Sequence, residues 1–152
     1  MEKVCFLFGH NTAPESLLST LESAIENCCT ELGVRQFVVG QHGDFDRLAM
    51  RALRAVKQRH DDVELSLLLH YHPAEHHIEL PKDFDGSIYP EGMETVPHRA
   101  AIVAGNRRMV HNSDVLVCYV RHPGNSKDLM EYAQKQGKVV INIAKQQNGM
   151  FT

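Results

Sequence analysis

The sequence predicts a single α/β domain: a doubly wound, mainly parallel sheet of five strands with helices on both faces, a Rossmann-like arrangement. Short, continuous apolar runs alternate along the chain with longer segments in which apolar residues recur every three or four positions. The short runs lack the polar alternation of a strand with one wet face, so we expect both of their faces to be buried, as in a parallel sheet. The length of 152 residues fits one domain, which we assign to 1–152.

The strands are expected at the five apolar runs, over residues 4–8, 37–39, 64–69, 115–120 and 139–143. Helices are expected in the intervals between them. In the first helix Leu17, Leu21 and Ile25 recur every four residues, and Thr12 with Glu15 has the spacing of an N-terminal capping box. The interval from about 70 to 97 lacks periodicity and is rich in proline and charge, which predicts an irregular insertion that could form a lid or side wall.

The loop after the first expected strand contains Gly9, His10 and Asn11. In open parallel sheets, ligands bind beyond the carboxyl ends of the strands, at the point where the strand order reverses. Gly9 permits a close backbone approach, and the two polar side chains could donate to a phosphate or contact a base or ribose. A plain tight turn at Gly9 is the alternative.

The loop after the second strand has the most informative spacing in the chain. Gly40 and Gly43 lie three residues apart, and Asp44 then opens an amphipathic helix. That pattern leaves backbone N–H groups bare at a helix N-terminus, where a phosphate or another anion would bind. Asp44 either caps the helix or accepts a ribose hydroxyl.

The loop after the fourth strand, with Gly124, Asn125 and Ser126, is a second candidate anion site. Ser126 is expected to cap the following helix and to offer its hydroxyl to a phosphate. Glu131, further along that helix, could reach back as a base or ribose ligand, and Arg107 could neutralise phosphate charge. An exposed helical carboxylate and a solvated basic face are the alternatives for these two residues.

These motifs resemble the SLOG superfamily of small Rossmann-like proteins related to DprA and the lonely-guy phosphoribohydrolases, particularly its YpsA-like stand-alone members. The resemblance spans nearly the whole chain. It is carried by the segments Gly9–His10, 38–46, 106–110, 113–116 and Gly124–Ser126.

The resemblance implies a pocket for a nucleotide or nucleotide derivative, such as an ADP-ribose-like molecule, formed by the loops at Gly40–Asp46 and Gly124–Ser126. The stand-alone members look more like nucleotide sensors than enzymes, which is the function we expect here, with no cofactor and with possible self-association. The alternative is a lonely-guy-type hydrolase that cleaves the N-glycosidic bond of a nucleoside 5′-monophosphate. Glu131 would then assist catalysis and Arg107 would hold the phosphate, but the glycine run of those enzymes is incomplete around Gly124.

Composition and missing motifs exclude several other classes. No G-x-G-x-x-G follows the first strand, and no G-x-x-x-x-G-K-[ST] is present. The net charge of −3 and the pI near 6.3 argue against double-stranded nucleic acid as a partner. The absence of a long apolar run or a secretory signal favours a cytoplasmic protein with no membrane partner. The histidine-rich stretch 70–77 matches no recognised ligand spacing, so no metal site is expected.

Overall fold

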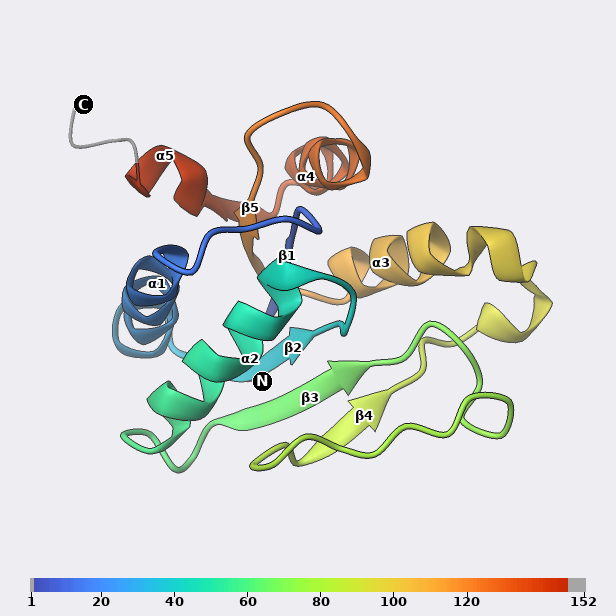
Figure 1. Cartoon of the computed structure of the whole chain (residues 1–152), viewed down its shortest axis with the longest axis horizontal. Helices are drawn as coiled ribbons and strands as arrows, with labels where there is room; N and C mark the ends of the chain where they lie inside the picture. Colours follow the sequence, from blue (N-terminus) through green and yellow to red (C-terminus); the bar gives the residue numbers. More distant parts are fainter. Residues whose placement is uncertain (1, 148–152) are drawn as a thin grey trace.

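A six-stranded, all-parallel sheet forms the centre of the computed structural model, which describes residues 2–147 (Figure 1). Its strands are β1 (Lys3–Gly9), β2 (Val34–Val39), β3 (Glu64–Leu68), β4 (Gly86–Ile88), β5 (Val115–Tyr119) and β6 (Val139–Asn142). Their order across the sheet is β4-β3-β2-β1-β5-β6. The chain therefore builds outward from β1 to β4 and then crosses to the other side of β1. The strand order reverses between β1 and β5, where a parallel sheet opens a crevice at its carboxyl edge.

The predicted fold class is confirmed, but the sheet has six strands and not five. The additional strand, β4, lies inside the segment that was expected to be irregular. It has only three residues, Gly-Ser-Ile, and pairs with β3 from Ser66↔Gly86 to Leu68↔Ile88. A three-residue strand at the edge of a sheet contains too few apolar positions to produce a recognisable run.

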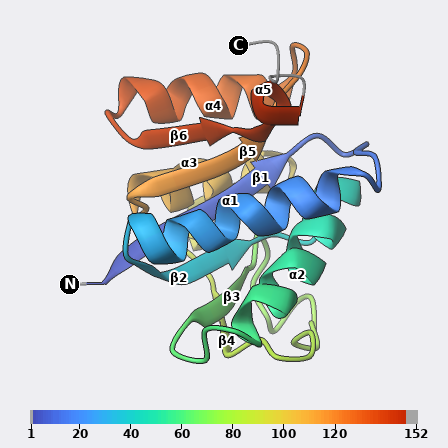
Figure 2. The same ribbon diagram turned by 90° about the vertical axis from the view of Figure 1, so that its left-hand side faces the viewer.

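Helices cover both faces of the sheet (Figures 1 and 2). One face carries α1 (Leu17–Glu31), α2 (Asp44–Lys57) and the short α5 (Ile143–Gln147). The opposite face carries α3 (Ala101–His111) and α4 (Asn125–Lys135). Two 3₁₀ turns, η1 (Met93–Thr95) and η2 (His98–Ala100), lead into α3. Figure 2 shows α1 and α2 in front of the strands and α3 behind them.

The buried faces of β1 explain why its sequence is a continuous apolar run. Cys5 and Leu7 pack in the cluster under α1 and α2, whereas Phe6 and Phe8 pack in the cluster under α3 and α4. Successive side chains of a strand point to opposite faces, so a strand covered on both sides is apolar at most positions. All four cysteines of the chain are buried free thiols.

The first helix begins later than the sequence predicted. The capping box at Thr12 and Glu15 is wrong, because α1 starts at Leu17. The preceding segment is tied to the start of α2 instead: the Ala13 N–H donates to Asp44 Oδ2 at 3.4 Å. The predicted inner face, with Leu17 and Leu21 fully buried, is confirmed.

None of the helices in residues 2–147 combines the length and apolar character needed to cross a bilayer.

Candidate functional site

A cavity of about 540 Å³ opens at the carboxyl ends of β1 and β5, where the strand order reverses. Its walls come from the loops after β1, β2 and β5, from the end of β3 and from the inner side of α3. Apolar side chains, including Phe8 and Leu129, form part of the wall, and polar groups face the opening. Ligand pockets of this kind measure about 300–1,000 Å³, so the cavity is large enough for a nucleotide-sized molecule.

Most of the residues predicted for the site line this one cavity, although they come from three separate loops. The lining residues are Gly9, His10, Asn11, Gly40, Gly124, Asn125 and Ser126. Parallel strands end at the same edge of a sheet, so loops far apart in sequence are brought together.

Gly43, Asp44, Arg107 and Glu131 are not among the lining residues. The guanidinium of Arg107 lies 4.9 Å from the ring centroid of Tyr132, above a different hollow between α3 and α4. Glu131 is exposed on α4. The structure thus brings together the loop residues but not the two long side chains proposed to reach the ligand.

The turn before α2 differs from the anion-binding loop that its glycines suggested. Gly43 has a φ of +94°, and a Cβ there would lie 2.7 Å from the Cα of Asn11. The Asp44 N–H donates to the carbonyl oxygen of Asn11 at 2.6 Å, and the Asp44 carboxylate pairs with Arg47. Gly43 therefore allows two loops to pack closely, and the first N–H of α2 already has a protein partner.

A carboxyl group of the protein accepts a hydrogen bond from the loop that was expected to hold an external anion. Asp46 Oδ2 accepts a hydrogen bond from the His42 N–H at 2.8 Å. A Cβ on Gly40 would lie only 3.1 Å from the same oxygen, so glycine at this position gives the carboxyl group room. The segment from Gly40 to Asp46 thus contributes a carboxyl group to the cavity and differs from the expected anion-binding loop.

The N-terminus of α4 is open. Gly124 is the N-cap residue, with a φ of +148°, and no side chain caps the helix. Ser126 is the second helical residue, so its predicted role as the cap is wrong. Within residues 2–147, the backbone N–H groups of Asn125, Ser126 and Lys127 have no acceptor. Unpaired N–H groups at the positive end of a helix dipole favour an anion.

His10 and His122 form a stacked pair at the mouth of the cavity. Their ring centroids are 3.8 Å apart and their planes differ by 4°. The Arg121 N–H donates to His10 Nε2 at 2.8 Å, so the ring proton of neutral His10 is on Nδ1. Burial, with a smaller contribution from the nearby His122 and Arg121, lowers the pKa of His10. At neutral pH His10 is therefore an uncharged ring with one N–H donor beside the cavity.

A second group of polar side chains crosses the cavity wall from β2 to α3. His70 Nε2 donates to Asn106 Oδ1 at 2.8 Å, and His42 Nε2 lies 3.1 Å from His70 Nδ1. Because Asn106 Oδ1 can only accept, His70 carries its proton on Nε2 and accepts from the N–H of His42 on Nδ1. Burial lowers the pKa of His70 to about 4 and also lowers that of His42. Both rings are neutral near pH 7.

Asp46 is the only carboxyl group that lines the cavity among the described residues, and it is 8% exposed. Burial raises its pKa to about 7, although the hydrogen bond from the His42 N–H and the charge of Arg47 act in the opposite direction. Near neutral pH this group exists in both protonation states. A carboxyl group of this kind can donate as well as accept a proton.

Sequence reasoning gave no ligand-binding role to His42 and Asp46, although both lie in the predicted loop Gly40–Asp46, and it missed His70, His122 and Asn106 as parts of this site. Two of them carry a signal in the sequence. His70 lies two residues beyond the end of β3 and directly after Leu69, the last residue of the apolar run, which is the position where ligand-binding side chains occur in parallel sheets. Asn106 is spaced three residues from Met109 and four from Val110, both buried against the sheet, so it is a polar residue on the inner face of α3.

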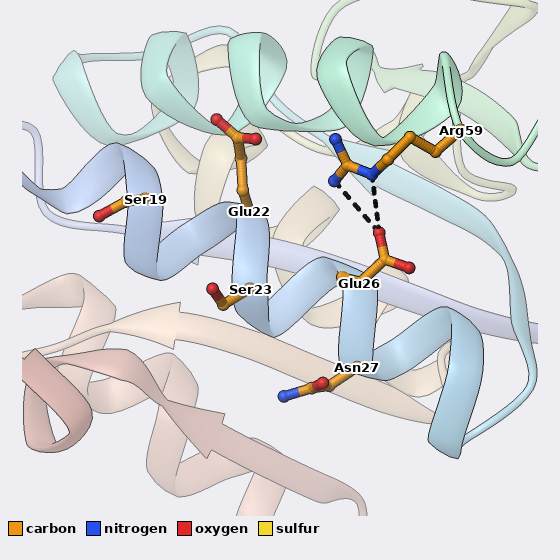
Figure 3. Close-up of a pocket in the computed structure, with 6 residues that line it drawn as sticks. All are labelled: Ser19, Glu22, Ser23, Glu26, Asn27 and Arg59. Atoms are coloured by element: carbon orange, nitrogen blue, oxygen red, sulfur yellow. Dashed lines mark hydrogen bonds and ion pairs between the residues drawn. The ribbon is translucent and has the colours of Figure 1, made fainter.

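A separate hollow of about 430 Å³ lies on the solvent side of α1 (Figure 3). It is lined by Ser19, Glu22, Ser23, Glu26, Asn27 and Arg59. Glu26 is already paired with Arg59 at 3.1 Å and with His60 at 2.5 Å. With Glu26 paired to Arg59 and His60 and the other lining side chains spread along the surface of α1, this hollow offers no convergent set of free polar groups.

Together, the fold and the cavity define a Rossmann-like α/β protein with a polar, histidine-rich site at the point where the strand order reverses. Comparison of the chain with protein-family models and with curated proteins found no match. The resemblance to the SLOG superfamily therefore stays a prediction from its short motifs.

Proposed function

We propose that this protein binds a nucleotide or a nucleotide derivative, such as ADP-ribose, in the cavity at the carboxyl ends of β1 and β5, and that it acts as a sensor of that molecule. The observation that carries this proposal is the open N-terminus of α4, where three successive backbone N–H groups lack an acceptor in the described part of the chain. A phosphate is the group that such a helix end binds best.

The rest of the cavity supports a ligand with both polar and aromatic parts. His122 is exposed and stacks on His10 with one face, so its other face is available to a base. The Nδ1–H of His10 and the amide of Asn11 can donate to ribose or phosphate oxygens. The motifs shared with the SLOG superfamily favour the same class of ligand. Self-association and a cytoplasmic location remain predictions of the sequence.

Binding is tested with purified protein and AMP, NAD and ADP-ribose, by calorimetry and thermal shift. Asn125→Asp is the most informative variant, because it is nearly isosteric and favours the start of a helix, yet it puts a negative charge beside the expected phosphate. Two unit charges 4 Å apart repel by about 1 kcal/mol in water and by about 4 kcal/mol at an effective dielectric constant of 20. Affinity should therefore fall by at least about 5-fold.

The matched control is Gln134→Glu, which adds the same charge at an exposed position near the far end of α4. It should leave affinity unchanged within about 2-fold, since exposed charges beyond about 10 Å are largely screened. Equal affinities for the wild type and Asn125→Asp would contradict phosphate binding at this helix.

Asp46 also supports a second function, hydrolysis of the N-glycosidic bond of a nucleotide. Such a reaction needs a carboxyl group beside the ligand, and Asp46 lines the cavity whereas Glu131 is exposed outside it. Release of free base from AMP would indicate the hydrolase. Loss of release in Asp46→Asn would assign the acid to Asp46, and loss in Glu131→Ala would assign it to Glu131. Binding without release supports the sensor.

A further inference from the structure

Three potential metal ligands meet on the surface between the loop after β3 and η2. Glu75 and His76 come from the loop, and His98 is the first residue of η2. One carboxylate oxygen and one nitrogen of each imidazole all lie within 4.8 Å of one another. The cluster is separate from the cavity at the strand ends, because none of its three residues lines that cavity.

The backbone of the loop presents Glu75 and His76 together. The N–H groups of both residues donate to the carbonyl oxygen of His72, at 2.9 and 3.0 Å. The ring of His72 adds a third contact, since its Nδ1 accepts from the Ala74 N–H at 3.0 Å. This turn holds the backbone of Glu75 and His76 in place, so that both side chains start from neighbouring positions.

Contacts between the loop after β3 and η2 bring His98 close to Glu75 and His76. Its Nε2 lies 3.0 Å from Glu75 Oε2. The ring of Tyr71 lies beside both imidazoles, with its centroid 4.8 Å from that of His76 and 5.2 Å from that of His98. A cavity of about 120 Å³, lined in part by Glu75 and His98, lies between the two segments.

We propose that Glu75, His76 and His98 bind one divalent transition-metal ion, with Zn²⁺ as the best fit. Two imidazoles and one carboxylate are a ligand set that Zn²⁺ uses, and three protein ligands leave a fourth position for water or another small ligand. With bonds of 2.0–2.2 Å, ligand atoms in a tetrahedral zinc site lie about 3.4 Å apart. The three side chains are exposed, so small rotations close the remaining distance. Imidazole ligands also favour transition metals over Mg²⁺ and Ca²⁺.

The simpler alternative is a surface ion pair between Glu75 and protonated His98. That pair accounts for the 3.0 Å contact but leaves His76 without a role, although the ring centroid of His76 lies 6.2 Å from that of His98 and its nitrogen within 4.8 Å of the other two ligand atoms. In the metal site, the ion takes the place of the proton between His98 and Glu75. The two states are mutually exclusive and can be distinguished by metal titration.

Metal binding would join the loop after β3 to the segment that leads into α3. That loop contains His70, and α3 carries Ile102 and Asn106; all three residues line the main cavity. The ion would therefore fix the loop after β3 and α3, which form two walls of the cavity, relative to each other. The proposal itself does not rest on the identity of the ligand in that cavity.

The test is a calorimetric titration of untagged, chelator-treated full-length protein with ZnCl₂, repeated with MgCl₂. We expect one Zn²⁺ per chain with a Kd of 10 μM or tighter, and no binding of Mg²⁺ at the same concentrations. His76→Ala and His98→Ala should each weaken Zn²⁺ binding at least 10-fold. The matched control is His77→Ala, because His77 is the neighbouring exposed histidine and lies outside the cluster.

Cobalt provides an independent measurement, since tetrahedral Co²⁺ absorbs visible light with an intensity that octahedral Co²⁺ in water lacks. The wild type and His77→Ala should develop this absorption, and His98→Ala should not. Circular dichroism of each variant verifies that it is folded. Absence of Zn²⁺ binding at 100 μM, or binding that is unchanged in both His76→Ala and His98→Ala, would overturn the proposal.

Discussion

His70 Nε2 donates a hydrogen bond of 2.8 Å to Asn106 Oδ1, which links the carboxyl end of β3 to the inner face of α3. This pair makes the loop after β3 part of the cavity wall. The close approach depends on Gly105: a Cβ at that position would lie 2.8 Å from Cδ2 of His70. A polar side chain and a glycine, adjacent in one helix, thus position a buried imidazole.

Replacing Asn106 with leucine should destabilise the protein by about 1–3 kcal/mol, because it leaves the N–H of buried His70 without an acceptor. Urea unfolding measures the change in the free energy of unfolding. Asn27→Leu on the exposed side of α1 is the matched control and should change stability by no more than about 0.5 kcal/mol. Equal effects of the two substitutions would show that the His70–Asn106 hydrogen bond contributes nothing.

The contact between Gly9 and Phe45 predicts a non-additive pair of substitutions. A Cβ on Gly9 would lie 2.6 Å from Cγ of Phe45, so Gly9→Ala should cost about 1–3 kcal/mol. Phe45→Leu alone leaves a cavity, but it also makes room for the new methyl group. The double variant should therefore lose at least about 0.5 kcal/mol less than the sum of the two single losses.

Leu53→Ala supplies the control for this cycle, since Leu53 is buried two turns further along α2. Its effect should add to that of Gly9→Ala within about 0.5 kcal/mol. An additive result for the Phe45 pair would mean that the backbone of β1 moves to relieve the clash.

Two cavity groups with large pKa shifts, Asp46 and His70, should change stability with pH in opposite directions. The pKa of Asp46 is raised from 3.8 to about 7, so the folded state binds more protons than the unfolded state between these values and stability falls as pH rises. The pKa of His70 is lowered from 6.5 to about 4, so the unfolded state binds more protons in that window and stability rises with pH. In the wild type the two slopes oppose each other from about pH 4 to 6.5.

Asp46→Asn removes the pH dependence of stability that Asp46 causes. It keeps an oxygen that can accept a hydrogen bond from the His42 N–H. The variant should become more stable as pH rises from 4 to 6.5, because the contribution of His70 is no longer offset. At pH 8 it should exceed the wild type by on the order of 2 kcal/mol, since it buries no charge. Urea unfolding at pH 4, 5, 6, 7 and 8 measures both effects. Parallel stability curves for the two proteins would refute the raised pKa of Asp46.

Much of the fold could be predicted because most buried strands and helix faces have a recognisable apolar pattern in the sequence. β1 and β5 are apolar runs, β3 is apolar apart from Glu64 and Ser66, and the face of α1 with Leu17, Leu21 and Ile25 repeats every four residues. β4 could not be predicted, because pairing with β3 and not its own three residues makes it a strand. The start of α1 was also misplaced, because the segment before it contacts Asp44 at the start of α2, a tertiary contact that has no local signal in the sequence.

The loops that form the site could be predicted from the sequence, but the contacts between their residues could not. Strand ends placed Gly9, Gly40 and Gly124 at one edge of the sheet, as parallel topology requires. Which helix N-terminus stays open depends on tertiary contacts: Asn11 takes the first N–H of α2, whereas nothing in the described structure takes those of α4. The raised pKa of Asp46 likewise follows from burial, which its position in a first helical turn does not reveal.

The most direct test of the account is a titration of ¹⁵N-labelled protein with ADP-ribose and AMP, followed by amide NMR shifts. We expect the largest shifts at the N–H groups of Asn125, Ser126 and Lys127, where the phosphate would accept hydrogen bonds, and smaller shifts at His10 and Asn11. The amides that line the hollow on α1 should not move. Saturable binding that leaves Asn125, Ser126 and Lys127 unshifted, or no binding of either nucleotide at millimolar concentration, would contradict the account.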